Sequence, residues 1–338
     1  MDITSHQGSL LDAGGNLTVT AGRDLSVLGS SLAATGDTRL AAGGDVTIAS
    51  AENRHRTEQT AKRHHSVKDH GQTVGSMVDT GGSLKITSGG DTAITASSLL
   101  AGEDLAVAAA GNLTVEGANS TQRESYASKS SGFLRKKESR GNSSEDVYTG
   151  SMLLAGGDVN LRSGQDLTVS GSTIIGGGDV ALAGDNVTLT TGQAAFDSYT
   201  FEKKSGLFAG RSPSGSGFSV GYRRTKEESS TSGVTNIMSA ISAGQNLTVT
   251  ATKDINATGT ALLAGEDLTL AAGGDVNLLA ATDSFAASHH RSDLFIGATV
   301  SAASPSSTQA TRLSRACRAL AVARAILATR PSPPLPVA

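Results

Sequence analysis

The sequence predicts an all-β protein whose scaffold is a right-handed parallel β-helix. Two observations support this fold class. A motif of Gly-x-Asp/Asn followed by alternating apolar and polar residues recurs along the chain, and like copies lie about 21 residues apart. In addition, the 338 residues include 41 Gly but only seven Phe, four Tyr and no Trp. We therefore expect a narrow core filled by small aliphatic side chains, as stacked coils require.

Each motif combines a corner with a short strand, as in Gly-Gly-Asn-Leu-Thr-Val at 14–19 and Gly-Gly-Asp-Val-Asn-Leu at 156–161. The alternating residues turn their apolar side chains to one face and the polar one to the other. We expect the Gly to adopt a positive φ at the corner and the Asp or Asn to bond its own backbone two residues on, as an Asx-turn. Leu, Val, Ile and Ala should fill the interior, while Thr, Ser and Asn face water.

The corner positions fall into four quartets, in which the steps alternate short, long and short, as at 16, 24, 37 and 45. Position 83 of the second quartet is a Ser, and the step before Asn186 is one position shorter than its equivalents. This spacing predicts about eight coils, which at roughly 4.8 Å per coil make a rod on the order of 40 Å long. The predicted structural corners are Asn16, Asp24, Asp37, Asp45, Asp91, Asp104, Asn112, Asp158, Asp166, Asp179, Asn246, Asp254, Asp267 and Asp275.

Four insertions interrupt the coils, at about 50–80, 117–150, 192–241 and 281–305, always in the long step of every second coil. They should therefore project from one face of the rod. We expect β-hairpins, the third with arms at 198–204 and 217–224 and its tip at 212–216. The predicted organisation is a β-helical stalk over 1–300 and an atypical tail over 306–338.

Aromatic and basic residues concentrate in the insertions, which hold every Phe and Tyr and 18 of the 28 Lys and Arg residues. Two interpretations remain open. The hairpins could lie along the rod and protect its sheet edges, or their tips could contact a partner, membrane or glycan, because Tyr, Phe and Arg dominate contact surfaces. The candidate partner contacts are Tyr126, Phe133, Tyr199, Phe201, Phe208, Phe218 and Tyr222.

The first insertion contains His55, His64, His65 and His70 near Glu58 and Asp69. A metal cluster and a solvated basic hairpin are both conceivable, and we favour the hairpin because no helical spacing fixes the ligands. Calcium binding is not favoured, because the nonapeptide β-roll has a much shorter repeat than these coils. We expect neither a metal nor a cofactor.

The sequence argues against catalysis as the primary role. A polysaccharide-cleaving β-helix would need paired carboxylates at one unrepeated place, whereas the Asp residues here recur at corners. The single Cys317 excludes a disulfide framework, and a net charge of −3 gives no reason to expect nucleic acid. We predict no enzyme, and a carbohydrate-active β-helix enzyme or an autonomous glycan-binding adhesin stays as the alternative.

The coils and the third insertion together resemble a known family. The coils, with Phe-Glu-Lys-Lys-Ser-Gly-Leu-Phe at 201–208, Gly-Phe-Ser-Val-Gly-Tyr at 217–222 and a Ser/Thr-rich return at 228–236, resemble the haemagglutinin repeats of filamentous haemagglutinin and of contact-dependent growth inhibition exoproteins. The resemblance covers roughly residues 10–300. The first insertion departs from it, because it lacks the Gly-Phe element.

The resemblance implies a segment of a very long stalk that an outer-membrane transporter exports by two-partner secretion. Adhesion or toxin delivery would be the role of the whole system, on the bacterial surface or in the medium. The implied partners are that transporter and a receptor or glycan on a host or target cell, with no nucleic acid.

The two ends of the sequence differ from the stalk. Residues 311–330 contain five Arg and no acidic residue, and we interpret this tail as disordered or out of frame, with a basic amphipathic helix as the alternative. No apolar run of about 18 residues is present. The N-terminus shows no secretion signal, so we expect either an intracellular protein or a piece of a longer chain.

Overall fold

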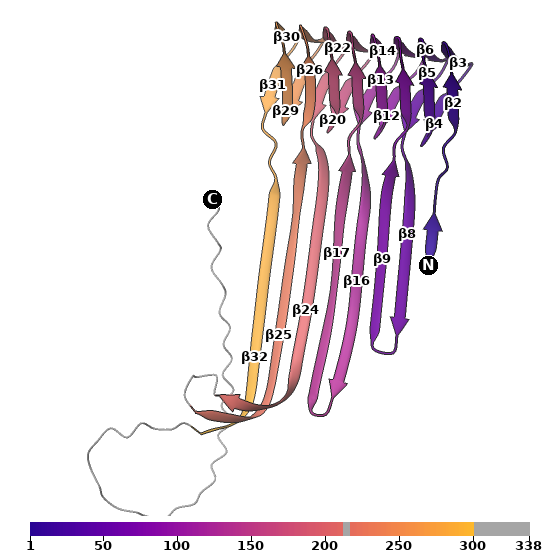
Figure 1. Ribbon diagram of the computed structural model, residues 1–338. Helices are drawn as coiled ribbons and strands as arrows, with labels where there is room; N and C mark the ends of the chain where they lie inside the picture. Colours follow the sequence, from indigo (N-terminus) through magenta and orange to yellow (C-terminus); the bar gives the residue numbers. More distant parts are fainter. Residues whose placement is uncertain (212–216, 301–338) are drawn as a thin grey trace, which may run out of the picture.

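The computed structural model describes residues 1–211 and 217–300, and this part of the chain is a parallel β-helix from which an antiparallel sheet projects sideways (Figure 1). Each of eight coils contributes one strand to each of three parallel sheets. The predicted β-helix of eight coils with hairpins on one face is confirmed. The predicted hairpin tip at 212–216 and the predicted tail at 306–338 lie outside the described residues.

The three parallel sheets form the stalk. The first sheet contains β2 (Leu10–Ala13), β5 (Ser31–Ala34), β10 (Met77–Thr80), β13 (Ser98–Ala101), β18 (Met152–Ala155), β21 (Thr173–Gly176), β26 (Ser239–Ala243) and β29 (Thr260–Ala264). The second contains β3 (Leu17–Ala21), β6 (Thr38–Ala42), β11 (Leu84–Ser88), β14 (Leu105–Ala109), β19 (Val159–Ser163), β22 (Val180–Gly184), β27 (Leu247–Ala251) and β30 (Leu268–Ala272). The third contains β4 (Leu25–Leu28), β7 (Val46–Ala49), β12 (Thr92–Thr95), β15 (Leu113–Glu116), β20 (Leu167–Ser170), β23 (Val187–Thr190), β28 (Ile255–Thr258) and β31 (Val276–Leu279).

The projecting antiparallel sheet, which we call the wing, is built from the insertions. Its strands, in spatial order, are β1 (Asp2–Thr4), β8 (Ala51–Ala61), β9 (His64–Val74), β16 (Ala118–Gly132), β17 (Arg135–Thr149), β24 (Gly192–Arg211), β25 (Phe218–Ile237) and β32 (Ser284–Val300). The chain enters the wing after β7, β15, β23 and β31, which close every second coil.

The stalk core consists of aliphatic ladders, because like positions of successive coils pair in register. In the second sheet Leu40 pairs with Ile86 and Ile86 with Val107, and all three are at most 1% exposed. Burying such a side chain contributes about 1.5–3 kcal/mol. The prediction of a core without aromatic residues is confirmed for the stalk.

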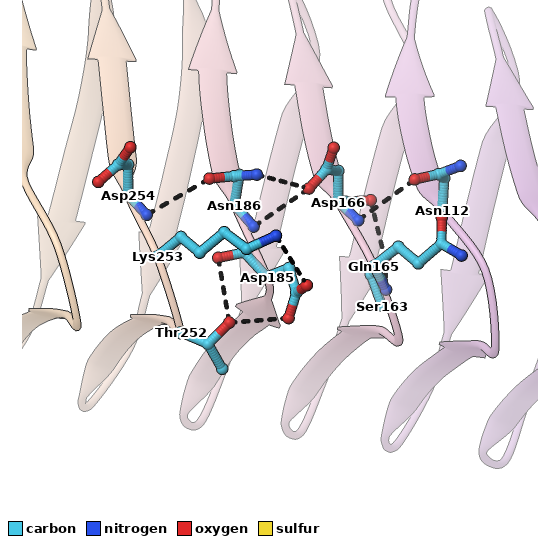
Figure 2. A network of polar contacts seen from close by, with 9 residues as sticks. All are labelled: Asn112, Ser163, Gln165, Asp166, Asp185, Asn186, Thr252, Lys253 and Asp254. Atoms are coloured by element: carbon cyan, nitrogen blue, oxygen red, sulfur yellow. Dashed lines mark hydrogen bonds and ion pairs between the residues drawn. The ribbon is translucent and has the colours of Figure 1, made fainter.

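The Asp and Asn corners stabilise the stalk between coils, not within one coil as predicted. The Asp45 N–H donates to Asp24 Oδ1 (2.9 Å), and the Asp91 N–H donates to Asp45 Oδ1 (2.8 Å). Figure 2 shows the same bond from Asp166 to Asn112 and from Asn186 to Asp166. The Asx-turn interpretation is therefore wrong, because the nearest unpaired N–H is that of the coil stacked above.

Two rows of such bonds follow the two corners on either side of the second sheet. One row begins at Asn16, whose Oδ1 accepts from the Asp37 N–H (2.9 Å), and the other begins at Asp24. At position 83 of the first row the Ser hydroxyl instead donates to Glu103 Oε2 (3.1 Å). Asp and Asn thus recur because each row uses one side-chain oxygen per coil to accept the backbone N–H of the next coil.

The corner glycines are required for close stacking and not for a positive φ. A Cβ on Gly90 would lie 2.1 Å from Asp45 Oδ1, and one on Gly89 would lie 2.2 Å from the Gly43 carbonyl oxygen. Among the described residues a positive φ occurs elsewhere, at the third corner, in Gly29, Gly171 and Gly259. Our conformational explanation of the Gly-Gly pair is therefore wrong.

The third corner carries a row of buried serines that sequence reasoning missed. The Ser76 N–H donates to Ser97 Oγ (3.2 Å), the Ser97 N–H to Ser151 Oγ (3.3 Å), and the Ser151 N–H to Ser172 Oγ (3.2 Å). Each of these side chains is at most 2% exposed. The expectation that Ser faces water is wrong here, although Ser76 and Ser97 are separated by one full coil and so share the period of the repeat.

The shortened step before Asn186 is accommodated by a local network (Figure 2). Asp185 accepts from Thr252 Oγ1 (2.7 Å) and pairs with Lys253 Nζ (3.2 Å), both on the next coil. These contacts hold the pKa of Asp185 below its usual range. The shortened corner therefore keeps the register of the stack.

Candidate interaction surface

The wing is continuous because its strands have the same spacing as the coils. Three hairpins, β8–β9, β16–β17 and β24–β25, contribute two strands each, and β1 and β32 add one strand each, so the described wing has one strand for each of the eight coils. Strands of a sheet and coils of a β-helix are both about 4.8 Å apart. Neighbouring hairpins consequently pair with each other, β9 with β16, β17 with β24 and β25 with β32.

The hairpins stand away from the stalk and do not lie along it (Figure 1). Their strands lengthen along the chain, from 11 residues in β8 to 15 in β16 and 20 in β24. The predicted arms of the third hairpin, at 198–204 and 217–224, were too short, because residues 192–197, 205–211 and 225–237 also pair. The interpretation that hairpins lie along the rod is wrong, and each hairpin protects the edge of its neighbour.

Tyr148 joins the wing to the stalk. Its hydroxyl donates to the Ser170 carbonyl oxygen (2.9 Å) and accepts from the Gly117 N–H (2.9 Å). A Cβ on Gly192 would lie 2.1 Å from the Tyr148 ring, so the ring packs directly on that backbone. Burial of the phenol raises its pKa.

An ion pair joins the two strands of the first hairpin. Arg54 donates through Nε (2.7 Å) and Nη2 (2.5 Å) to the two carboxylate oxygens of Asp69, and the Arg54 hydrogen bond holds the pKa of Asp69 low. His55 lies directly opposite His70. Within residues 1–211 and 217–300 no three His, Cys, Asp or Glu side chains gather as metal ligands.

One face of the wing carries an exposed apolar patch near its far end. Directly opposite residues of an antiparallel sheet share a face. Leu207, Tyr222 and Ile296 form one row across β24, β25 and β32 and are 51%, 41% and 56% exposed. The patch comprises Leu207, Phe218, Val220, Tyr222, Ile296 and Val300.

The opposite face carries a basic depression at the same end. A row across four strands reads Arg135, Gly206, Arg223 and Phe295, and the next row towards the stalk includes Lys137 and Lys204. The depression encloses about 720 Å³ and is lined by six basic residues and one acidic residue, Glu227. We call Arg135, Lys137, Lys204, Arg223 and the floor residue Gly206 the basic depression.

The structure distributes the seven candidate partner contacts over both faces and the turns. Phe133, in the turn of the second hairpin, is 92% exposed, and Tyr126, Phe218 and Tyr222 are 41–54% exposed. Tyr199 and Phe208 are half-buried. Phe201 is only 7% exposed and lies beneath the Arg140 guanidinium, whose Cζ is 4.5 Å from the ring centroid. It thus offers little area to a partner.

Sequence reasoning missed Leu207, Val220, Ile296 and Val300, because it followed only aromatic residues. The alternation Phe-Ser-Val-Gly-Tyr at 218–222 was a readable signal of one apolar face. This alternation could not show that β32 places Ile296 and Val300 beside Tyr222 and Phe218 on the same face.

The chain forms a parallel β-helix with a lateral wing, and the Asp side chains at the corners of the β-helix accept hydrogen bonds from backbone N–H groups. These features define a stalk-like repeat protein. Its sequence agrees with this class. Four consecutive segments, at 1–68, 60–134, 133–222 and 220–314, match the family described as the hemagglutinin repeat, so the chain belongs to that family.

Similar proteins are much longer than this chain. It is 32% identical over 278 residues to the "tRNA nuclease CdiA-2" of Burkholderia pseudomallei strain 1026b, a match covering 77% of this chain and 9% of that protein. It is 29% identical to the "tRNA nuclease CdiA" of Escherichia coli strain STEC_O31 over 76% of this chain and 8% of that protein. It is 29% identical to the "Toxin CdiA" of Yersinia pestis, over 63% of this chain and 8% of that protein.

The chain thus spans less than a tenth of the length of these relatives. No solved structure matches it. Among the described residues no helix has the length and apolar character needed to cross a membrane.

Proposed function

We propose that this chain is a stalk segment of a much longer exported surface protein that acts in adhesion or in contact-dependent toxin delivery. The observation that carries the proposal is the unbroken register of eight coils, with a wing insertion after every second one. Such an array adds length and a repeated lateral surface. The names of the similar proteins, toxin and nuclease, support the delivery role for the whole protein, not a catalytic role for this segment.

The proposal assigns different tasks to the two parts of the fold. The stalk provides reach, and the wing meets a receptor or glycan on a host or target cell. An outer-membrane transporter is the proposed export partner, and secretion to the bacterial surface is the proposed location. A chain with a single Cys suits passage through a pore in an extended form, because no disulfide has to be accommodated.

The wing is the part to test. A variant that replaces 205–224 by a two-residue turn keeps the pair Lys204 and Thr225 at the new end of the hairpin. We expect it to lose most cell attachment, measured by flow cytometry with the labelled 338-residue chain. A matched shortening of the first hairpin, replacing 57–68, serves as the control and should retain attachment.

If the wild type and the 205–224 variant attach to cells equally well, the proposal that the wing contacts a receptor or glycan is refuted. The carbohydrate-active alternative is tested separately, by following reducing ends released from plant and bacterial polysaccharides. Turnover that is lost on substitution of corner Asp residues would favour that alternative, because those residues would then have a role beyond accepting backbone hydrogen bonds.

A further inference from the structure

We propose that the outward face of the first parallel sheet of the stalk binds a second copy of this chain, so that two stalks associate side by side. We call this surface, formed by the outward side chains of β2, β5, β10, β13, β18, β21, β26 and β29, the lateral face. The inference goes beyond the proposed function, because the lateral face includes neither the wing nor the apolar patch.

The lateral face is apolar on the side of the strands that points away from the core. In the first sheet the inward residues fill the core, as Leu99 and Ile174 do at 0% exposure, and their neighbours in each strand point outward. Met152 and Ile175 are both 39% exposed, so the wing does not cover them. The large apolar residues that point outward from this sheet are Met77, Leu100, Met152, Leu154, Ile175 and Leu263.

The other two parallel sheets show that the fold does not require such a face. Outward positions of the second sheet carry Arg, Lys, Thr, Asn and Ala, as at Arg39 and Lys85. Outward positions of the third sheet carry mainly Thr, Ser and Asn, and its large apolar ones, Leu28 and Leu279, lie in the first and last of the described coils. A sheet face in water is normally polar, so the first sheet departs from the pattern of its neighbours.

The apolar side chains of the lateral face form a ridge with space beside it. Leu100 pairs with Leu154 and Leu154 with Ile175, so these three side chains stack on consecutive coils. In the column beside them Met152 stands between two smaller polar residues, which leaves room on either side of it. Two such faces can interdigitate about 10 Å apart, and Met adapts its shape to fill the gaps.

Charge and area favour a second copy as the occupant. Across the eight described strands of the lateral face there is no Lys or Arg, and the only carboxylates are Asp12 and Asp79, so the face has little charge with which to select a charged partner. A second copy has the same flat shape and the same coil spacing, and a two-fold pair uses the same patch twice. Eight strands of about four residues cover about 40 Å by 13 Å, so pairing buries about 1,000 Å² in total, the least that a specific complex needs.

The test is sedimentation-velocity ultracentrifugation of the labelled and unlabelled 338-residue chain over a range of concentrations. We expect a reversible monomer–dimer equilibrium with a Kd on the order of 10–100 µM, because the buried area is at the lower limit for a specific complex. A chain that stays monomeric up to about 200 µM would overturn the proposal.

Three variants locate the interface. Leu154→Lys places a charge at the centre of the lateral face, where it is desolvated in the dimer, and should raise the Kd about tenfold or more. Thr168→Lys, the matched control on the outward side of β20 in the same coil, should change the Kd by less than about twofold. Asp79→Leu exchanges a charge on the face for an apolar side chain and should lower the Kd several-fold. Urea midpoints of each variant establish that the fold is retained.

Equal weakening by Leu154→Lys and Thr168→Lys would overturn the proposal. End-to-end stacking is the competing arrangement, because Leu278 in the last described coil is 65% exposed. Leu278→Lys should leave the dimer intact, and a dimer that is lost in Leu278→Lys but kept in Leu154→Lys would assign the contact to the ends and refute the lateral face. The variant with the shortened third hairpin should dimerise like the wild type, so cell attachment and side-by-side association succeed or fail separately.

Discussion

The corner glycines offer the sharpest test of how the stalk is held together. In Gly90→Ala the new Cβ would lie 2.1 Å from Asp45 Oδ1 and 3.3 Å from the Gly44 carbonyl carbon. A carbon and an oxygen normally approach no closer than about 3.3 Å. Either Asp45 rotates away or the two coils separate locally.

The expected loss of stability follows from three contributions. Overpacking of this kind costs about 1–3 kcal/mol. Rotation of Asp45 also removes the hydrogen bond from the Asp91 N–H (2.8 Å), which contributes about 0.5–1.5 kcal/mol. Replacing Gly by Ala at a negative φ restores about 0.4–1 kcal/mol through the unfolded chain. The net destabilisation should be about 0.5–4 kcal/mol.

The chain contains its own control. Gly15 occupies the same motif position in the first coil, and a Cβ there would meet nothing within 4 Å. Urea denaturation of the full chain, followed by circular dichroism, should show a lower midpoint for Gly90→Ala and an unchanged or higher midpoint for Gly15→Ala. In an Asp45→Ala background the oxygen is absent, so Gly90→Ala should cost at least about 1 kcal/mol less.

The reasoning would be refuted by equal midpoints for Gly90→Ala and Gly15→Ala. It would also be refuted by strict additivity of Gly90→Ala and Asp45→Ala, because the clash would then not involve the Asp45 oxygen. Either result would mean that the Gly-Gly pair serves a conformational need that the observed φ values do not show.

Three further predictions concern other contacts of the stalk and wing. Ala96 has a φ of 45° where the equivalent corners have Gly, so Ala96→Gly should raise the free energy of unfolding by about 0.5–1 kcal/mol, read from the urea midpoint; a lower midpoint would contradict this. Ser151→Ala should cost about 1–3 kcal/mol, because it leaves the buried Ser97 N–H without its acceptor and removes the hydrogen bond from the Ser151 hydroxyl to the Glu116 carbonyl oxygen (2.6 Å). The exposed Ser26→Ala should stay within about 0.5 kcal/mol, and similar effects of the two changes would argue against the serine row. The pKa of Tyr148 is raised in the folded protein, so the stability that its neutral hydroxyl contributes is fully present below the unfolded pKa of about 10 and is lost as pH rises through the folded pKa. Tyr148→Phe should lower the free energy of unfolding at pH 7 by about 1 kcal/mol, and above pH 10 its melting temperature should fall less than that of the wild type. Equal pH dependence of the two melting temperatures would contradict the assignment.

Much of the fold is readable from local repetition. The alternation of short and long steps between corners predicts the strands of each coil, and the excess length in every second coil predicts where the hairpins leave. The conformational reasons that we attached to the motif were less successful. Gly90 and Asp45 were explained by turn geometry within one coil, but the structure relates them across the stack.

The candidate surface was predictable in composition but not in arrangement. The enrichment of aromatic and basic residues in the insertions located the wing correctly, and Phe133 and Tyr222 are exposed as a contact role requires. Phe201 is covered, since Arg140 from the neighbouring hairpin lies over it. Which side chains meet across hairpins depends on a register that no single hairpin contains.

The sequence by itself determined the period, the number of coils and the sites of the insertions, because these depend on backbone pairing between equivalent positions of successive coils in an aliphatic repeat. Only the tertiary structure decided what the polar residues do. The coils stack about 4.8 Å apart, so a corner oxygen meets the next coil before it meets its own backbone. The same spacing joins separate hairpins into one wing, with the apolar patch on one face and the basic depression on the other.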